Sequence, residues 1–309
     1  MSALEQHLEE YLAVRRAMGY KLERAGLLLA QFTGWLADRD ATTITSELAL
    51  AWATLPAAGE SNWHGQRLSA VRGFAAHLHA IDPGHEVPAA DLLAWRRRRQ
   101  IPYLYDEQQI TALMAAASTL GSAHRTATIS TLIGLLSVTG MRVGEAIRLD
   151  RADLDAKHQL LTVHDTKFGK SRELALHPST ITALSAYLRR RDRPAPAAQT
   201  PAVFVSAAGT RLIYCNVQHT FSRLVDRAGL PVGSTSCRPR LHDLRHSFAV
   251  TVLIDAYRSG QDVQARLALL STYLGHVSPG STYWYLQAAP ELMALAAERL
   301  EDHLGGAGA

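Results

Sequence analysis

Cysteine is nearly absent from the chain, which has only Cys215 and Cys237 among its 309 residues. Two cysteines are too few for a disulfide framework or for a four-cysteine zinc site. Proline is also scarce, at 12 residues, while 47% of the residues are hydrophobic and 19% are charged. This composition excludes a disordered chain and is typical of a globular protein in a reducing compartment, so we expect it in the cytoplasm.

Long apolar runs are missing as well. The longest nearly apolar stretch, residues 127–138, is about half of the roughly 20 residues that a membrane-spanning helix needs. The first residues, MSALEQHLEE, carry acidic side chains where a secretory signal would carry basic ones followed by an apolar core. We therefore expect neither a membrane span nor export.

The sequence also lacks the signatures of several enzyme classes: the GxxxxGK[ST] loop, the GxSxG elbow and the HExxH helix. ATP and zinc are not implied, and we expect no metal and no cofactor. His242 and His246 stand four positions apart and could hold a metal on one helical face. This alternative stays open, although the permanent charge of Arg245 beside them suits an anion better than a cation.

Length and periodicity predict a mainly α protein with two domains and a basic linker. Residues 1–84 have helical periodicity and predict a bundle of about four helices. Prolines and a glycine then interrupt the pattern, and the linker 85–103 contains four consecutive arginines, Arg96, Arg97, Arg98 and Arg99. Arginines that repel one another are stabilised by a polyanion, so we expect these four to contact phosphates. A solvated charge cluster at a helix end is the alternative, and the net charge of +4 does not decide between them.

Residues 104–309 predict a mixed α+β domain with a small antiparallel sheet. Asp106 is placed to cap a first helix, and an apolar helix over 125–138 ends at Thr139 and Gly140. Two strands, 160–166 and 172–177, flank a turn that contains Gly169, and 202–206 can form a third strand. Further helices are expected over 141–149, 178–190, 216–229 and from 242 to 303, with breaks at Gly260 and at Pro279–Gly280.

Arg142 and Arg245 come from distant segments of this domain, and each is expected on a helix. A buried arginine needs a partner, and the planar guanidinium fits the oxygens of a phosphate best. Two such groups can close on the two non-bridging oxygens of one phosphodiester. At about 4 Å and an effective dielectric constant near 20, each contact contributes roughly 4 kcal/mol before desolvation is subtracted.

Three motifs share this domain with the two arginines: TGMRVGE at 139–145, HDLRH at 242–246 and LGH at 274–276. Tyr285 follows His276 by nine positions, and Lys167 lies in the predicted hairpin. On these residues the chain resembles the tyrosine recombinases of the phage integrase family. The motifs extend from residue 139 to residue 285, and the N-terminal bundle fits the SAM-like core-binding domain of the family without a motif of its own.

The resemblance implies a site-specific recombinase that cuts and rejoins DNA through a 3'-phosphotyrosine link, without ATP or magnesium. Tyr285 would attack the phosphate, Arg142 and Arg245 would hold it, and His242 would accept the phenol proton. His276 would bind a phosphate oxygen and Lys167 would protonate the departing 5'-oxygen. The enzyme would act as a homotetramer on two double-stranded DNA sites and be a monomer or dimer when free. It would integrate, excise or transpose a mobile element, or resolve DNA.

Several residues have other interpretations. Tyr283 is a rival nucleophile, although it would face nearly the opposite side of a helix from Tyr285. Lys170 or Arg172 could replace Lys167 as the hairpin acid. Three further side chains have structural interpretations: Tyr273 as a core residue, His246 as a core histidine, and Glu145 as an ion-pair partner that holds Arg142.

Two segments of the chain differ from the family pattern, and two other functions are compatible with the motifs. Residues 256–262 look like an insertion relative to compact recombinases, and the amphipathic helix 290–304 could pack in cis or dock on a neighbouring subunit. A type IB topoisomerase would use nearly the same residues, and a silent sequence-specific DNA-binding protein would keep the same scaffold. Neither the target sequence nor the element served can be read from the chain.

Overall fold

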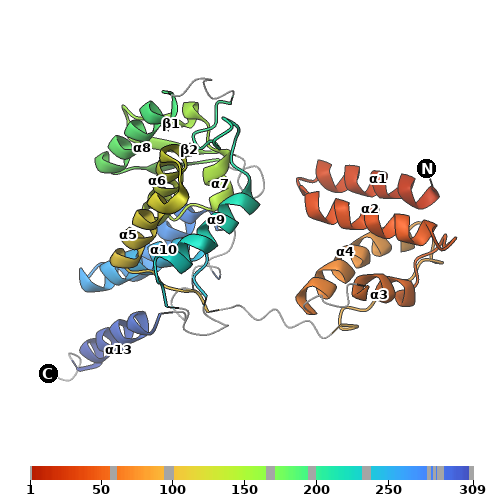
Figure 1. Cartoon of the computed structure of the whole chain (residues 1–309). Coiled ribbons are helices and arrows are strands. Elements are labelled where there is room, and N and C mark those ends of the chain that lie inside the picture. The colour runs from red at the N-terminus through yellow and green to blue at the C-terminus, as the bar shows by residue number, and fades with distance from the viewer. Residues whose placement is uncertain are drawn as a thin grey trace. The chain divides into compact units, whose positions relative to one another are not determined.

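The computed structural model describes residues 2–55, 61–93, 101–164, 171–193, 200–231, 238–276, 280, 283 and 289–305. The chain forms two compact units, Met1–Arg99 and Gln100–Ala309 (Figure 1). Several residues singled out in the sequence lie outside the described ones: the linker arginines Arg96, Arg97, Arg98 and Arg99, the hairpin residues Lys167 and Lys170, and Tyr285. Among the described residues, no helix has the length and apolar character needed to cross a bilayer.

The first unit is a bundle of four helices in its described part, as its periodicity predicted. These are α1 (Ala3–Ala17), α2 (Glu23–Ala37), α3 (Ser46–Thr54) and α4 (Ser61–His79). Ser2 caps α1 through a hydrogen bond from the backbone of Glu5, and Thr45 caps α3. Their apolar faces meet in a core that contains the buried rings of Phe32, Trp52 and Phe74.

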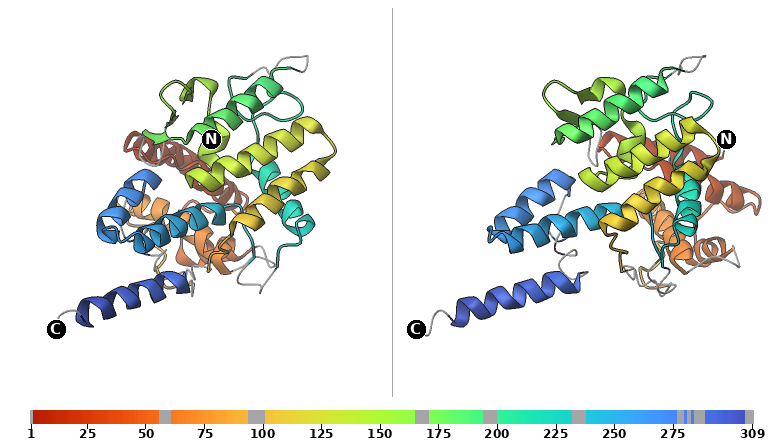
Figure 2. Two further views of the ribbon diagram at one scale, coloured as in Figure 1. Left: turned by 90° about the vertical axis from the view of Figure 1, so that its left-hand side faces the viewer. Right: turned by 60° about the vertical axis from the view of Figure 1, so that its left-hand side comes forward.

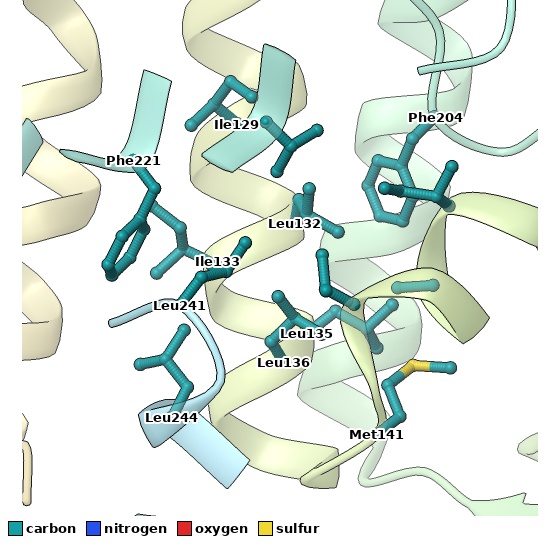
Figure 3. Packing of buried hydrophobic residues seen from close by; sticks show 14 of the residues in the cluster. Ile129, Leu132, Ile133, Leu135, Leu136, Met141, Phe204, Phe221, Leu241 and Leu244 are labelled. Carbon is teal, nitrogen blue, oxygen red and sulfur yellow. The ribbon is translucent and has the colours of Figure 1, made fainter. Parts of the chain in front are cut away.

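The second unit is mainly helical. Its helices are α5 (Glu107–Ala116), α6 (Ala123–Thr139), α7 (Val143–Arg148), α8 (Pro178–Arg191), α9 (Tyr214–Arg227), α10 (Asp243–Arg258), α11 (Val263–Leu274) and α13 (Pro290–Gly305). The apolar helix α6 is central, since Leu132 and Leu136 are almost fully buried and lie among Phe204, Phe221 and Leu244 from other segments (Figure 3). This explains the long apolar run in the sequence of α6.

A small antiparallel sheet of order β1-β2-β3 belongs to the same unit. Its strands are β1 (Leu154–Asp155), β2 (Leu160–Val163) and β3 (Arg172–Ala175). The register pairs Leu161 with Leu174, both fully buried, and Val163 with Arg172. The hairpin that the sequence predicted is therefore present, and Arg172 is the first residue of its second strand.

Two details of the predicted sheet were wrong. Residues 202–206 form no strand of the sheet, but make only isolated bridges, Asp150 with Ala202 and Val205 with Arg211. The segment is apolar because it crosses the core, where residues 202–205 are at most 2% exposed. The third strand is instead β1, whose two residues are too few to show alternation.

Helices α10, α11 and α13 share a second, smaller core within this unit. Leu253 of α10, Leu267 and Leu270 of α11, and Leu292 of α13 are buried together. Both views of Figure 2 place α13 alongside this pair of helices and away from the sheet. The break predicted at Gly260 is present between α10 and α11, where Gly260 has a φ of +68°.

Candidate active site

The first site segment is the corner between α6 and α7. Gly140 ends α6 with a φ of +58°, a conformation that glycine adopts readily. A Cβ at this position would overlap the ring of Phe248 on α10. Thr139 supports the corner by donating its hydroxyl to the carbonyl of Leu135 at 2.6 Å. The TG pair therefore brings α6 close to α10 and sets the start of α7, where Arg142 stands.

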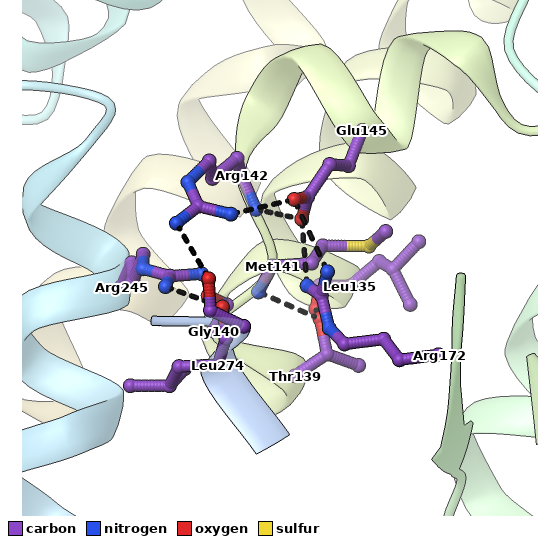
Figure 4. Close-up of polar contacts among 10 residues, drawn as sticks. Leu135, Thr139, Gly140, Met141, Arg142, Glu145, Arg172, Arg245 and Leu274 are labelled. Atoms are coloured by element: carbon purple, nitrogen blue, oxygen red, sulfur yellow. Dashed lines mark hydrogen bonds and ion pairs between the residues drawn. The ribbon is translucent and has the colours of Figure 1, made fainter. Parts of the chain in front are cut away.

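Arg245, which lies in the HDLRH motif, binds to both of the other motifs. Arg245 is only 2% exposed. Nη1 donates to the carbonyl of Gly140 at 2.9 Å and Nη2 donates to that of Leu274 at 2.7 Å (Figure 4). Because the guanidinium is held at both ends, it stays fixed between the α6–α7 corner and the end of α11.

Arg142 reaches the same place from α7. Its Nη2 donates to the carbonyl of Gly275 at 3.3 Å, and its Nη1 contacts Oε1 of Glu145 at 2.8 Å. The side chain keeps 33% of its surface exposed. Glu145 also accepts the backbone N–H of Arg142 at 2.9 Å, so the predicted ion pair is present and holds both ends of the residue.

Sequence analysis missed the second partner of Glu145, which is Arg172 from the hairpin. Arg172 contacts the carboxylate twice, at 2.7 Å from Nη2 to Oε2 and at 3.2 Å from Nη1 to Oε1. Burial would raise the pKa of Glu145, but the hydrogen bonds from Arg172 and from the Arg142 backbone outweigh burial and lower that pKa to about 2. The carboxylate is therefore charged at neutral pH.

This pairing bears on Arg172 as a substitute for Lys167. A guanidinium keeps its proton at all working pH values, and this one is committed to Glu145. Both facts make Arg172 a poor proton donor to an alkoxide. The local sequence does not indicate the contact between Arg172 and Glu145, because 27 positions separate the two residues and only the tertiary fold brings them together.

Two histidines lie among these cations. His276 follows Gly275, whose φ of +66° ends α11, and His242 immediately precedes α10. The pKa of His276 is lowered to about 3 by desolvation and then by Arg245 and Arg142. Desolvation, followed by the nearby His246 and Arg245, lowers the pKa of His242 to about 4. Both imidazoles are therefore neutral at pH 7 and can accept a hydrogen bond.

His246 lies against His242, with ring centroids 5.1 Å apart and planes at 88°. The described residues contain no group of three or more His, Cys, Asp or Glu side chains suited to a metal ion. The pair thus lacks a third ligand within that part of the chain, and the nearby guanidiniums of Arg245 and Arg142 favour an anion instead.

The structure brings together Arg142, Arg245, His242 and His276 of the predicted site. Tyr273 also lies where the sequence predicted, half-buried and packed against the core, with its ring stacked on Phe248 at 5.7 Å. The rival nucleophile Tyr283 is 44% exposed and lines a pocket of about 280 Å³ with Tyr257, Asp262 and Arg299.

Comparison with known proteins assigns the class. Residues 104–291 match the profile described as "Phage integrase family". The chain belongs to the phage integrase family, the tyrosine recombinases, enzymes that cleave and rejoin DNA. A Sinorhizobium fredii protein that bears the name integrase/recombinase y4rB is 42% identical, over 97% of this chain and 98% of its own. Tyrosine recombinase XerC of Mycobacterium tuberculosis is 30% identical over 97% and 98%.

Solved structures with low sequence identity share the fold. The integrase of transposon Tn1549 in complex with transposon right end DNA has a TM-score of 0.63 at 16% identity, covering 95% of this chain and 99% of that chain. A lambda integrase tetramer bound to a Holliday junction has a TM-score of 0.59 at 17% identity, covering 89% and 78%. The predicted fold class is thereby confirmed.

Proposed function

We propose that this recombinase exchanges strands between two specific DNA sites at one catalytic centre, which comprises Arg142, Lys167, His242, Arg245, His276 and Tyr285. The observation that carries the proposal is the convergence of Arg142 and Arg245 on the consecutive carbonyls of Gly275 and Leu274. Two guanidiniums that meet at one backbone turn can share one phosphodiester. His276, the residue after Gly275, adds a neutral imidazole at the same point.

The arginines act on the phosphate. Arg142 keeps part of its surface open to solvent, while Arg245 is fixed in place by two carbonyls. In-line attack adds negative charge to the pentacoordinate phosphorus, and preorganised cations stabilise that state more than the ground state. Catalysis therefore rests on charge and position, and needs no metal ion in this scheme.

The covalent step exchanges one phosphate ester for another. The phenol oxygen of Tyr285 bonds to phosphorus, the bond from phosphorus to the 5'-oxygen breaks, and a 3'-phosphotyrosine ester results. A phenol with a reference pKa near 10 must lose its proton during attack, and His242, neutral at pH 7, accepts it. Lys167 supplies a proton to the departing 5'-oxygen. The ester retains the bond energy, so a 5'-hydroxyl from the other site reverses the step.

DNA binding is assigned to the helical unit and the basic linker. The linker arginines Arg96, Arg97, Arg98 and Arg99 would contact backbone phosphates, and residues 1–84 would act as the core-binding domain. The Tn1549 integrase, which matches 95% of this chain, is bound to transposon DNA. Movement of a mobile element is therefore the biological role that we favour.

Assembly into a tetramer is supported by the C-terminal helix. Leu292 of α13 is buried in cis against α10, whereas Met293 and Leu300 remain 59% and 57% exposed. An exposed apolar face on a terminal helix is suited to contact a neighbouring subunit. The lambda integrase in the matching structure is a tetramer on a Holliday junction.

The first experiment uses a target selected by the protein itself. Tyr285→Phe protein enriches its binding site from a random duplex library, and that sequence is then made with a nick beside the scissile phosphate. Wild-type protein should form a covalent adduct that survives detergent and EDTA. Tyr283→Phe should keep the adduct and Tyr285→Phe should lose it.

Other outcomes select other functions. A Tyr285→Phe protein that still forms the adduct would falsify the assignment of the nucleophile. Relaxation of plasmids without the selected sequence would indicate a topoisomerase. Tight, salt-sensitive binding without any adduct would indicate a silent DNA-binding protein.

A further inference from the structure

We propose that Arg172 is a positioning residue that locks the orientation of Arg142 through Glu145 and links the hairpin to the end of α11. The inference rests on the proposed function for its catalytic meaning. Its structural content, the immobilisation of Arg142, stands on the contacts alone.

The first contact is with Glu145. Arg172 holds both carboxylate oxygens, and each oxygen also accepts from Arg142: Oε1 from its guanidinium and Oε2 from its backbone N–H. A carboxylate with one partner can rotate, whereas one held on both oxygens from two sides cannot. The residue is only 3% exposed, so water does not compete for these bonds. The direction of the Arg142 guanidinium is therefore set from the far side of Glu145.

The second contact is with Gly275. A Cβ on this glycine would lie 3.1 Å from Nη1 of Arg172 and 3.5 Å from its Cζ. The guanidinium thus packs directly against the backbone of the residue whose carbonyl binds Arg142. A positive φ and this close approach both favour glycine here. Arg172 therefore supports both the donor and the acceptor of the Arg142–Gly275 hydrogen bond.

Arg172 belongs to the hairpin, so its contact with Glu145 also fixes the second hairpin strand. It is the first residue of β3, at the end of the hairpin on which Lys167 lies in the sequence. Only 13% of its side chain is exposed. The contacts of Arg172 with Glu145 and Gly275 therefore hold the start of β3 against α7 and against the end of α11.

The contact with Glu145 depends on the geometry of the Arg172 guanidinium as well as on its charge. The Glu145 carboxylate forms ion pairs with both Arg142 and Arg172. Lysine would keep the charge of Arg172, but its single nitrogen lacks the planar two-nitrogen geometry that holds both carboxylate oxygens. Arg172→Lys therefore separates the charge of the residue from its two-point geometry.

A test without DNA measures the guanidinium itself. In ¹⁵N-labelled protein, the Nη signals of Arg142, assigned by their loss in Arg142→Lys, should be separate because rotation is hindered. In Arg172→Gln they should merge, and in Arg172→Lys they should broaden. Unchanged signals in Arg172→Gln overturn the inference, whatever the protein does to DNA.

A matched control separates this effect from general loss of an ion pair. Arg151 pairs with Asp192 at 2.7 Å on the surface, where 47% and 37% of the two side chains are exposed. Arg151→Gln should leave the Arg142 signals unchanged. If Arg172→Gln does not fold, Glu145→Gln/Arg172→Gln removes both buried charges together, and the Arg142 signals should merge in it as well.

The catalytic consequence is tested on the nicked site selected by the protein. Arg172→Gln should slow adduct formation about 100-fold, the cost of losing one preorganised donor. On the same site with a methylphosphonate at the scissile position, which has no charge to neutralise, the loss should shrink to about 10-fold or less. Equal losses on both linkages would indicate general disruption and overturn a role exerted through Arg142. Absence of an adduct with wild-type protein would instead refute the proposed function and leave the guanidinium signals to decide the inference.

Discussion

Arg142 and Arg245 donate hydrogen bonds to the carbonyls of consecutive residues, Gly275 and Leu274, although Arg142 is the residue before α7 and Arg245 lies in α10. The end of α11 is therefore the point where the TGMRVGE, HDLRH and LGH motifs meet. A ligand that touches both guanidiniums must lie beside His276. The geometry explains why a phosphodiester fits this place better than a cation.

Arg245→Lys tests the two-carbonyl clamp. Lysine can satisfy at most one of the carbonyls of Gly140 and Leu274, so a buried acceptor loses its partner. We expect unfolding in urea to become easier by about 1–3 kcal/mol. Arg258→Lys is the control, because Arg258 is 63% exposed in its pair with Glu291 and should change stability by less than about 0.5 kcal/mol. Equal effects of the two substitutions would contradict the clamp.

Gly140→Ala tests the contact of the α6–α7 corner with α10. The added Cβ meets a positive φ, which costs about 1–2 kcal/mol, and also overlaps Phe248, which costs about 1–3 kcal/mol more. Gly121→Ala has a similar φ of +73° and open space around it, so it should show only the first cost. Denaturant unfolding of the two variants gives the difference. If they are equally stable, the close approach to Phe248 is not a constraint.

His276 predicts a pH dependence of stability. Its pKa is about 3 in the folded protein and 6.5 in the unfolded chain, so the unfolded chain binds the proton more readily between these values. The free energy of unfolding therefore decreases as the pH is lowered from 6.5 to about 3. From pH 7 to pH 5 the loss from this partly exposed group should be about 1 kcal/mol. His276→Asn should be less pH-sensitive by that amount, and an identical pH profile would refute the shift.

Substitutions of Leu292 and Leu300 distinguish the packing of α13 within the protein from its proposed contact with a neighbouring subunit. Leu292→Ala removes a side chain that is 1% exposed and should destabilise the protein by about 2–5 kcal/mol. Leu300→Ser alters a side chain that is 57% exposed and should leave the unfolding midpoint of the free protein unchanged. Light scattering on the selected DNA site should instead show loss of the tetramer. A tetramer that forms normally with Leu300→Ser would exclude this face from the subunit contact.

Local patterns predicted much of the fold. The apolar run of α6, its glycine end and the start of α8 at residue 178 each depend on neighbouring residues, and all three predictions were confirmed. The predicted strand over 202–206 was wrong, because a short apolar segment that crosses a core has the same composition as a strand. Four predicted site residues meet in space, and their motifs announced them. Arg172 was assigned no partner, because nothing near it in the sequence indicates Glu145.

The sequence by itself determined the chemistry available: the motifs name the arginines, histidines and tyrosine, and the helical periodicity places them in a mainly α fold. Only the tertiary structure decided how those groups are held. The carbonyls that fix Arg245 and Arg142 are long-range partners, and so is Glu145 for Arg172, whereas the ion pair between Glu145 and Arg142 is local and was predicted. Periodicity reports which face of an element is buried, but direction and burial of a charge depend on what the whole fold packs against it.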